Sequence, residues 1–210
     1  MEVIRIKNNE VNSSLYRELL ANHIRGKKTI IVVPLSNDIE KDFLLSNEYA
    51  SYLAFKGFLE ALDLTDYFRQ IGINVRYLDI HEGGINTNKN YLDAIIESID
   101  PYYFTKYLNS YDCLVICGGI GLYHTSLTLL GEEGADLSAV ALGVRLDCPI
   151  VFFDEGIKKQ SADDFYSYVI QNDIPFNMKA LLLLKNNNPI IIHKMEVPHV
   201  LYLYSHSNPL

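Results

Sequence analysis

The chain has 210 residues, a length that fits one large domain or two small ones and buries most apolar surface without disulfides or metals. Its composition, 49% hydrophobic and 21% charged, is that of a globular protein and excludes a disordered or fibrous one. The formal net charge of -8, without a dense lysine and arginine run, argues against nucleic acid or an anionic membrane as a partner.

The cysteines do not form a disulfide framework. Cys113 and Cys117 lie in one apolar run that reads as a strand, where they are separated by roughly 13 Å and cannot bridge. Cys148 is the third cysteine. With no signal peptide at the start and no apolar stretch of about 20 residues, we expect a reduced, cytoplasmic protein.

The N-terminal part of the chain reads as strand, helix, strand. Val3 to Lys7 is a short β-branched run, and the capping residues Asn12 and Ser13 precede leucines at helical spacing that end at Gly26. Residues 29–33 are almost continuously apolar, which is typical of a strand covered on both faces. This β-α-β order is the unit of a parallel sheet.

The middle of the chain continues the alternation of helices and strands. Apolar positions between Glu48 and Ile71 fit one helix or two, with Gly57 weakening the middle. The pattern further predicts a strand over 73–80, a short helix or strand over 92–99, a helix over 101–108 that Pro101 starts, and a strand over 113–117.

Glycines follow the last of these strands. Gly118-Gly119-Ile120-Gly121 is predicted to be a turn that exposes its backbone, followed by a loop of mixed character to Gly131. The remaining predicted elements are a helix over 134–146, a strand over 150–153, a helix over 162–170, an apolar run of uncertain type over 180–184, and strands over 189–193 and 199–204. Since no repeat or linker divides the sequence, we predict a single α/β domain over 1–210, either doubly wound or three-layer, with a mostly parallel sheet.

A series of short motifs runs through the chain from about residue 3 to residue 157. They are Ile6-Lys7, VVPLS at 32–36, Asn47-Glu48 with Ser51, GINT at 84–87, GGIG at 118–121 and LGEEGADLSA at 130–139. In this order they resemble the KFGG, VVVSA, GE..S, GI.T, GFIG and LGRGGSDTTA motifs of aspartate kinases, in the amino acid kinase family. The collinear order makes the resemblance more specific than any one glycine motif.

The resemblance implies a three-layer α/β/α sandwich that phosphorylates the side-chain carboxylate of aspartate, with MgATP as the cofactor. Aspartate kinases usually carry regulatory domains after the catalytic domain, and because the chain ends at Leu210 we expect none here. The implied site residues are Lys7 and Asp136 for catalysis, Glu48, Ser51 and Glu132 for the substrate, and Gly118, Gly119, Gly121 and Lys179 for the nucleotide. The histidines His193, His199 and His206 lack a compact metal-ligand spacing, so we expect no resident metal.

Several family positions carry residues that disfavour ordinary phosphoryl transfer. Asn9 and Glu10 stand where the family has two glycines, and a carboxylate at Glu10 repels a polyphosphate. Glu132 replaces the arginine that holds the substrate's carboxylate, which reverses the charge. Phe152 and Phe153 replace polar residues near the nucleotide.

Individual residues have two readings each. Lys7 contacts a phosphate or is a surface lysine at a strand end. Asp136 organises metal or substrate, or caps the helix that begins near Leu137. Glu48 contacts the substrate, or is a solvated first-turn glutamate that favours the helix dipole.

Three functions remain open on this sequence. The first is an aspartate-kinase-like protein that is impaired in phosphoryl transfer and binds a small molecule or a partner. The second is an active kinase for a carboxylate other than that of aspartate. The third is a structural partner of a full-length kinase, which predicts an apolar surface on the helices. For the first we expect a homodimer or association with another subunit.

Overall fold

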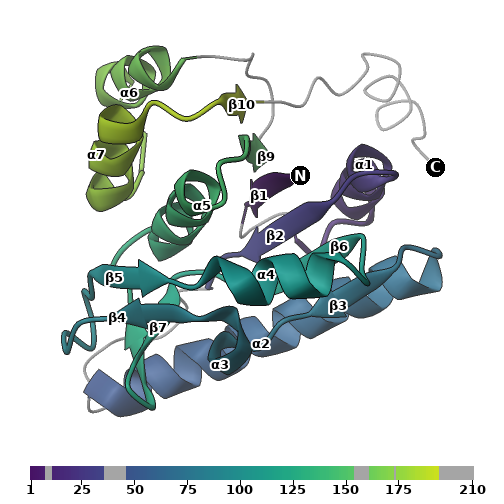
Figure 1. Ribbon diagram of the computed structural model, residues 1–210, viewed down its shortest axis with the longest axis horizontal. Helices are drawn as coiled ribbons and strands as arrows, with labels where there is room; N and C mark the ends of the chain where they lie inside the picture. The colour runs from purple at the N-terminus through teal and green to yellow at the C-terminus, as the bar shows by residue number, and fades with distance from the viewer. Residues whose placement is uncertain (8–10, 36–45, 154–160, 173, 194–210) are drawn as a thin grey trace, which may run out of the picture.

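The structure, a computed structural model, describes residues 1–7, 11–35, 46–153, 161–172 and 174–193 (Figure 1). Its main sheet has six strands in the order β10-β9-β1-β2-β6-β3, and all neighbouring strands run parallel. Every residue of β2, β6 and β9 is buried, as expected of parallel strands that are covered on both faces. The strands are β1 Glu2–Ile6, β2 Thr29–Val33, β3 Val75–Tyr77, β6 Cys113–Cys117, β9 Ile150–Phe153 and β10 Ile191–His193.

One face of this sheet is covered by α1 (Ser14–Ile24) and α2 (Ser46–Gln70). Leu20 of α1 and Phe68 of α2 belong to one buried cluster with Ile4 of β1. The cap of α1 is Ser13, as the sequence predicts, and its side chain accepts a hydrogen bond from the backbone N–H of Tyr16.

The opposite face carries α4 and α5. Val3 points away from Ile4 because successive strand residues face opposite sides, and it packs in a cluster with Phe104 of α4 and Leu142 of α5. Two further helices, α6 and α7, extend this layer and bury Phe152 of β9 (Figure 1). The helices are α4 Pro101–Leu108, α5 Gly134–Arg145, α6 Ala162–Gln171 and α7 Met178–Asn187. The predicted α/β/α sandwich with a mostly parallel sheet is confirmed.

A second, mixed sheet has four strands in the order β5-β4-β7-β8. It contacts α2 through β8 and α5 through β5 and β7. Its elements are β4 Ile85–Thr87, β5 Ile96–Ile99, β7 Ile120–Tyr123 and β8 Ser126–Leu129, with the short helix α3 Ile80–Gly83 before β4. The predicted loop between Gly118 and Gly131 is therefore wrong, because this segment forms the β7–β8 hairpin.

α2 is one continuous helix of 25 residues. Of the two possibilities that the sequence left open for this segment, one helix or two, the first is confirmed. Gly57 lies in its middle, where a Cβ atom would stand 2.3 Å from Cys117 Sγ and 2.6 Å from Leu35 Cδ2. The glycine therefore lets α2 approach β6 closely.

Three predicted segments have different outcomes. The strand predicted over 73–80 is shorter, because the Asp79 side chain accepts from the N–H of His81 and caps α3. The apolar run 180–184 belongs to α7. The strand predicted over 199–204 lies outside the described residues. No helix in the described part of the chain is both long and apolar enough to cross a membrane.

The cysteines Cys113, Cys117 and Cys148 are free and buried, which confirms that Cys113 and Cys117 do not pair. Burial raises the pKa of all three thiols, to about 11 for Cys148. Thiols with raised pKa values are poor nucleophiles at neutral pH.

Candidate functional site

The carboxyl ends of β1 and β9 mark the place where a doubly wound sheet binds its ligands. These strands are neighbours, but β1 leads to α1 and β2 on one side, whereas β9 leads to α6, α7 and β10 on the other. Such a reversal creates a crevice at the carboxyl ends of the strands. The predicted Asn9 and Glu10, and the DEGI segment at 154–157, lie outside the described residues.

Lys7 is the first residue beyond β1, so it lies at the carboxyl end of this strand. Its backbone N–H donates to Tyr16 Oη over 3.1 Å, and the same hydroxyl donates to the carbonyl of Phe153 at the end of β9 over 2.7 Å. Tyr16 thus connects the ends of the two strands. No pattern in the sequence indicates this role, because Tyr16 lies within an ordinary predicted helix, next to the apolar position Leu15.

Asp136 lies in the first turn of α5 and is fully buried. Its carboxylate accepts from Arg5 Nε over 2.6 Å and from the backbone N–H of Asn177 over 3.2 Å. Burial raises the pKa of Asp136 to about 6, an effect that the Arg5 charge opposes. The carboxylate therefore joins β1, α5 and the start of α7, a role that neither sequence reading foresaw.

Arg5 is the cation that sequence reasoning missed at this point. It lies in the middle of β1, its guanidinium stands 5.4 Å from the ring centroid of Phe152, and its side chain is only 12% exposed. In the sequence, Arg5 is a single arginine in an apolar strand. That pattern does not indicate that it pairs with a buried acid.

Asn177 fixes the segment before α5. Its side chain caps α7 by accepting from the N–H groups of Lys179 and Ala180, and its amide donates to the carbonyls of Leu130 and Glu132. The Glu132 side chain itself is exposed at the surface.

The glycine turn is packed against protein. Gly118 donates its N–H to the Val33 carbonyl over 2.7 Å, and Gly119 donates to Ser138 Oγ over 2.9 Å. A Cβ atom at Gly118 would stand 2.4 Å from Val32 Cγ1.

The third glycine of the motif is equally confined. A Cβ atom at Gly121 would stand 2.5 Å from Thr87 Cγ2, because β7 lies against β4 at this position. All three glycines are buried, so the prediction of an exposed backbone is wrong. Their small size serves the close contact of β6 and β7 with α5 and β4.

Lys179 is directed at a loop of the second sheet. Its Nζ donates to Asp93 Oδ1 over 2.5 Å and to the carbonyls of Asp93 and Ala94 over 3.1 Å each. The lysine predicted for the nucleotide thus holds α7 to the segment between β4 and β5.

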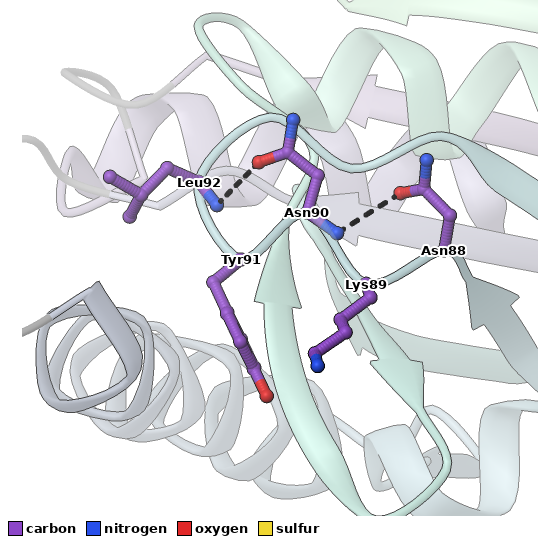
Figure 2. A pocket seen from close by; sticks show the side chains of 5 residues that line it. All are labelled: Asn88, Lys89, Asn90, Tyr91 and Leu92. Atoms are coloured by element: carbon purple, nitrogen blue, oxygen red, sulfur yellow. Dashed lines mark hydrogen bonds between the residues drawn. The ribbon is translucent and has the colours of Figure 1, made fainter.

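That segment carries a hollow of about 550 Å³ on the protein surface, lined by residues 88–92. Figure 2 shows Lys89 and Tyr91 pointing to one side of the loop, while the Asn88 and Asn90 amides point to the other. The Asn88 and Asn90 oxygens accept from the N–H groups of Asn90 and Leu92, respectively, and shape the turn.

The predicted substrate residues come from two segments of the chain. Glu48 and Ser51 lie near the start of α2 and are exposed, and Glu132 is exposed before α5. The structure brings Asp136 and Gly119 together at the start of α5, where Ser138 of the same helix binds the Gly119 N–H.

The described residues do not fit MgATP in the predicted way. A nucleotide's phosphates need N–H groups and cations aimed at them. In this structure the N–H groups of Gly118 and Gly119, and the Nζ of Lys179, are aimed at protein acceptors instead.

No protein-family model matches the sequence, and neither does any curated protein. Solved structures do match. Escherichia coli aspartokinase III in complex with aspartate and ADP is 10% identical, with a TM-score of 0.69 over 94% of this chain and 66% of that one. Aspartate kinase from Synechocystis is 16% identical, with a TM-score of 0.67 over 92% of this chain and 38% of that one.

A smaller enzyme also matches over nearly its whole length. UMP kinase from Ureaplasma parvum is 13% identical, with a TM-score of 0.59 over 99% of this chain and 95% of that one. The chain spans less than two thirds of the length of either aspartate kinase. At these identities the likeness concerns the fold, and the chain has the amino acid kinase fold that these proteins share.

Proposed function

We propose that the chain is an aspartate-kinase-like protein that is impaired in phosphoryl transfer and binds a small molecule or a protein partner. One observation carries the proposal. The groups expected to bind the nucleotide form hydrogen bonds with other parts of the protein instead. Lys179 binds Asp93 and Ala94, and the N–H groups of Gly118 and Gly119 bind Val33 and Ser138.

The substrate side supports the same reading. Asp136 is enclosed by Arg5 and Asn177 and is fully buried, so its carboxylate serves an internal ion pair. Glu132 presents a negative charge where the family has an arginine, which disfavours a carboxylate substrate in the usual pose.

Calorimetric titration of the purified protein with MgATP tests the proposal. We expect no binding at millimolar nucleotide. Micromolar binding would overturn it and favour the alternative, an ATP-dependent kinase for a carboxylate other than that of aspartate. Amino acids and other carboxylates would then be screened as phosphoryl acceptors, with Mg²⁺ present.

A specific observation favours a protein partner as well. Tyr52, Phe55 and Leu59 recur at helical spacing on α2 and are 40%, 60% and 49% exposed. Such a stripe is typical of a helix–helix contact. We propose a second copy of this chain as the partner, with the stripe of one α2 helix packed against the same stripe of the other, because a two-fold interface joins identical surfaces.

Sedimentation velocity tests this contact. Phe55→Glu is expected to convert a dimer to a monomer, whereas Leu182→Glu on α7, where Leu182 is 53% exposed, is the matched control and leaves the dimer intact. A monomeric wild-type protein would contradict the homodimer.

A further inference from the structure

The loop between β4 and β5 is shaped by two of its own asparagines. The side-chain oxygen of Asn88 accepts from the N–H groups of Asn90 and Ile95, over 3.3 and 3.1 Å. The side-chain oxygen of Asn90 accepts from the N–H groups of Leu92 and Asp93, over 3.3 and 3.2 Å. The main chain of residues 88–92 is therefore fixed by hydrogen bonds within the loop.

Two other elements hold the same loop in place. Leu129, at the end of β8, donates its N–H to the Tyr91 carbonyl over 2.8 Å and accepts from the Ala94 N–H over 2.7 Å. Lys179 of α7 binds the Asp93 carboxylate. Because the loop is held in this way, a ligand that binds to it does not have to order its main chain first.

Two side-chain donors of the loop point away from the protein to one side. Lys89 and Tyr91 are two residues apart and extend in the same direction (Figure 2). Within the described part of the chain, neither the Lys89 ammonium nor the Tyr91 hydroxyl has a hydrogen-bond or ion-pair partner. Both residues line the hollow of about 550 Å³, a volume within the range of small-molecule sites.

The charge of the hollow selects an anion. Its five lining residues include one cation, Lys89, and no acid. The acid that follows them in the sequence, Asp93, is neutralised by Lys179, whose Nζ stands 2.5 Å from Asp93 Oδ1. The hollow is thus locally positive on a protein whose formal net charge is -8. An ammonium group in such a place binds a carboxylate or a phosphate.

The available donors favour a carboxylate over a phosphate. Phosphate sites use main-chain N–H groups, but those of Asn90, Leu92 and Asp93 already donate to the asparagine oxygens. An ammonium and a phenol hydroxyl suit the two oxygens of a carboxylate. Beside them, the half-buried Tyr91 ring and Leu92, 36% exposed, offer apolar surface to the rest of the ligand.

We propose that the hollow over residues 88–92 binds a small carboxylate with an aromatic or other apolar body, and that Lys89 and Tyr91 donate to its two oxygens. The hollow contains none of the residues that the family resemblance implies for catalysis, substrate or nucleotide. The proposal therefore goes beyond the proposed function, and it holds whatever the outcome of the titration with MgATP.

NMR titration of the isotope-labelled protein with phenylacetate tests the site. We expect saturable shifts of the amide signals of residues 88–95, with a dissociation constant of about 1 mM or lower. 2-Phenylethanol, which has the ring but no charge, and inorganic phosphate are expected to bind about tenfold more weakly or less. Shifts that do not saturate with phenylacetate would overturn the site. Equal binding of phosphate would overturn the carboxylate class, and equal binding of 2-phenylethanol would overturn the role of the charge.

Three variants test the two donors in the same titration. Lys89→Met is expected to raise the dissociation constant about tenfold, and Tyr91→Phe, which keeps the ring, about threefold. Lys185→Met removes an exposed lysine that lies over Tyr166, outside the hollow, and leaves the constant unchanged. The amide signals outside residues 88–95 report that each variant remains folded. Unchanged affinity in Lys89→Met, or an equal loss in Lys185→Met, would overturn the assignment of the ammonium group.

Discussion

Arg5 and Asp136 form a charge pair that the fold places almost entirely out of water. Asp136 is fully buried and Arg5 is 12% exposed at its side chain, with 2.6 Å between Arg5 Nε and Asp136 Oδ1. Taking both charges out of water costs free energy that their attraction and the Asn177 N–H only partly return. Each partner therefore depends on the other.

Arg5→Met is expected to destabilise the protein by about 3–5 kcal/mol at pH 8, because it leaves the Asp136 carboxylate buried without its cation. The loss becomes smaller at pH 5, where Asp136 is protonated. Urea denaturation at the two pH values measures both effects. Arg69→Met, which removes an exposed pair with Asp66, is the control and costs about 1 kcal/mol at most. Equal losses for the two variants would contradict the importance of burial.

Stability is also expected to depend on pH through Asp136. Its pKa rises from 3.8 to about 6 on folding, so the folded state holds the proton more tightly. The stability from this group is present below about pH 4 and is lost as pH rises through about 6. The difference in unfolding free energy between wild type and Asp136→Asn should fall over this range by up to about 3 kcal/mol. A constant difference would exclude the raised pKa.

At the scale of elements, α2 owes its close approach to β6 to one residue. Gly57 faces Cys117 and Leu35, with no room for a methyl group between them. A glycine in a helix normally costs stability, but here the contact between helix and sheet compensates for it.

Gly57→Ala is expected to lower the free energy of unfolding by about 1–3 kcal/mol, because overpacking outweighs the better helix propensity of alanine. Thermal unfolding followed by circular dichroism measures the change. Gly83→Ala in α3 is the control, since its added Cβ meets only Phe104 Cζ, at 3.8 Å. A stabilised Gly57→Ala variant would show that Cys117 and Leu35 move aside at little cost.

Much of the main sheet could be predicted from the sequence. Strands β2, β6 and β9 are short, continuous apolar runs between polar turns, and their predicted bounds agree with the structure. The second sheet could not be predicted, because β4 and β7 carry asparagine and glycine, which are poor strand formers. Their pairing with each other comes from tertiary structure.

The candidate site was less predictable than the fold. The resemblance assigned Asp136 and the glycine turn to one site, and in the structure Gly119 lies against the start of α5, where Ser138 binds its N–H. The partners of these groups come from distant parts of the chain, as Arg5 and Asn177 do for Asp136. No local pattern indicates such partners. The sequence therefore could not predict that Asp136 and the glycine N–H groups bind other parts of the protein.

At the scale of the whole molecule, Lys179 connects α7 to the second sheet. Its ammonium group holds the Asp93 carboxylate and the carbonyls of Asp93 and Ala94. The side chain is 31% exposed, so the contribution of the ion pair to global stability is small.

Lys179→Met is therefore expected to change global stability by about 1 kcal/mol at most, while it speeds up amide hydrogen exchange in residues 88–95. Exchange followed by NMR resolves this segment from the rest. Lys185→Met, on the same helix but next to Tyr166, is the control and leaves the exchange of 88–95 unchanged. Unaltered exchange in Lys179→Met would show that the Asn88 and Asn90 turns hold the segment without the lysine.

The position of β1 has a consequence for how the chain folds during synthesis. β1 pairs with β2 at residues 29–32, but its other edge stays unpaired until β9, at residues 150–153, has been synthesised. On a ribosome that adds about 5–20 residues per second, one edge of the earliest strand stays open for many seconds. Contacts so distant in sequence slow folding, and the open edge is the one a chaperone or a neighbouring nascent chain would meet first.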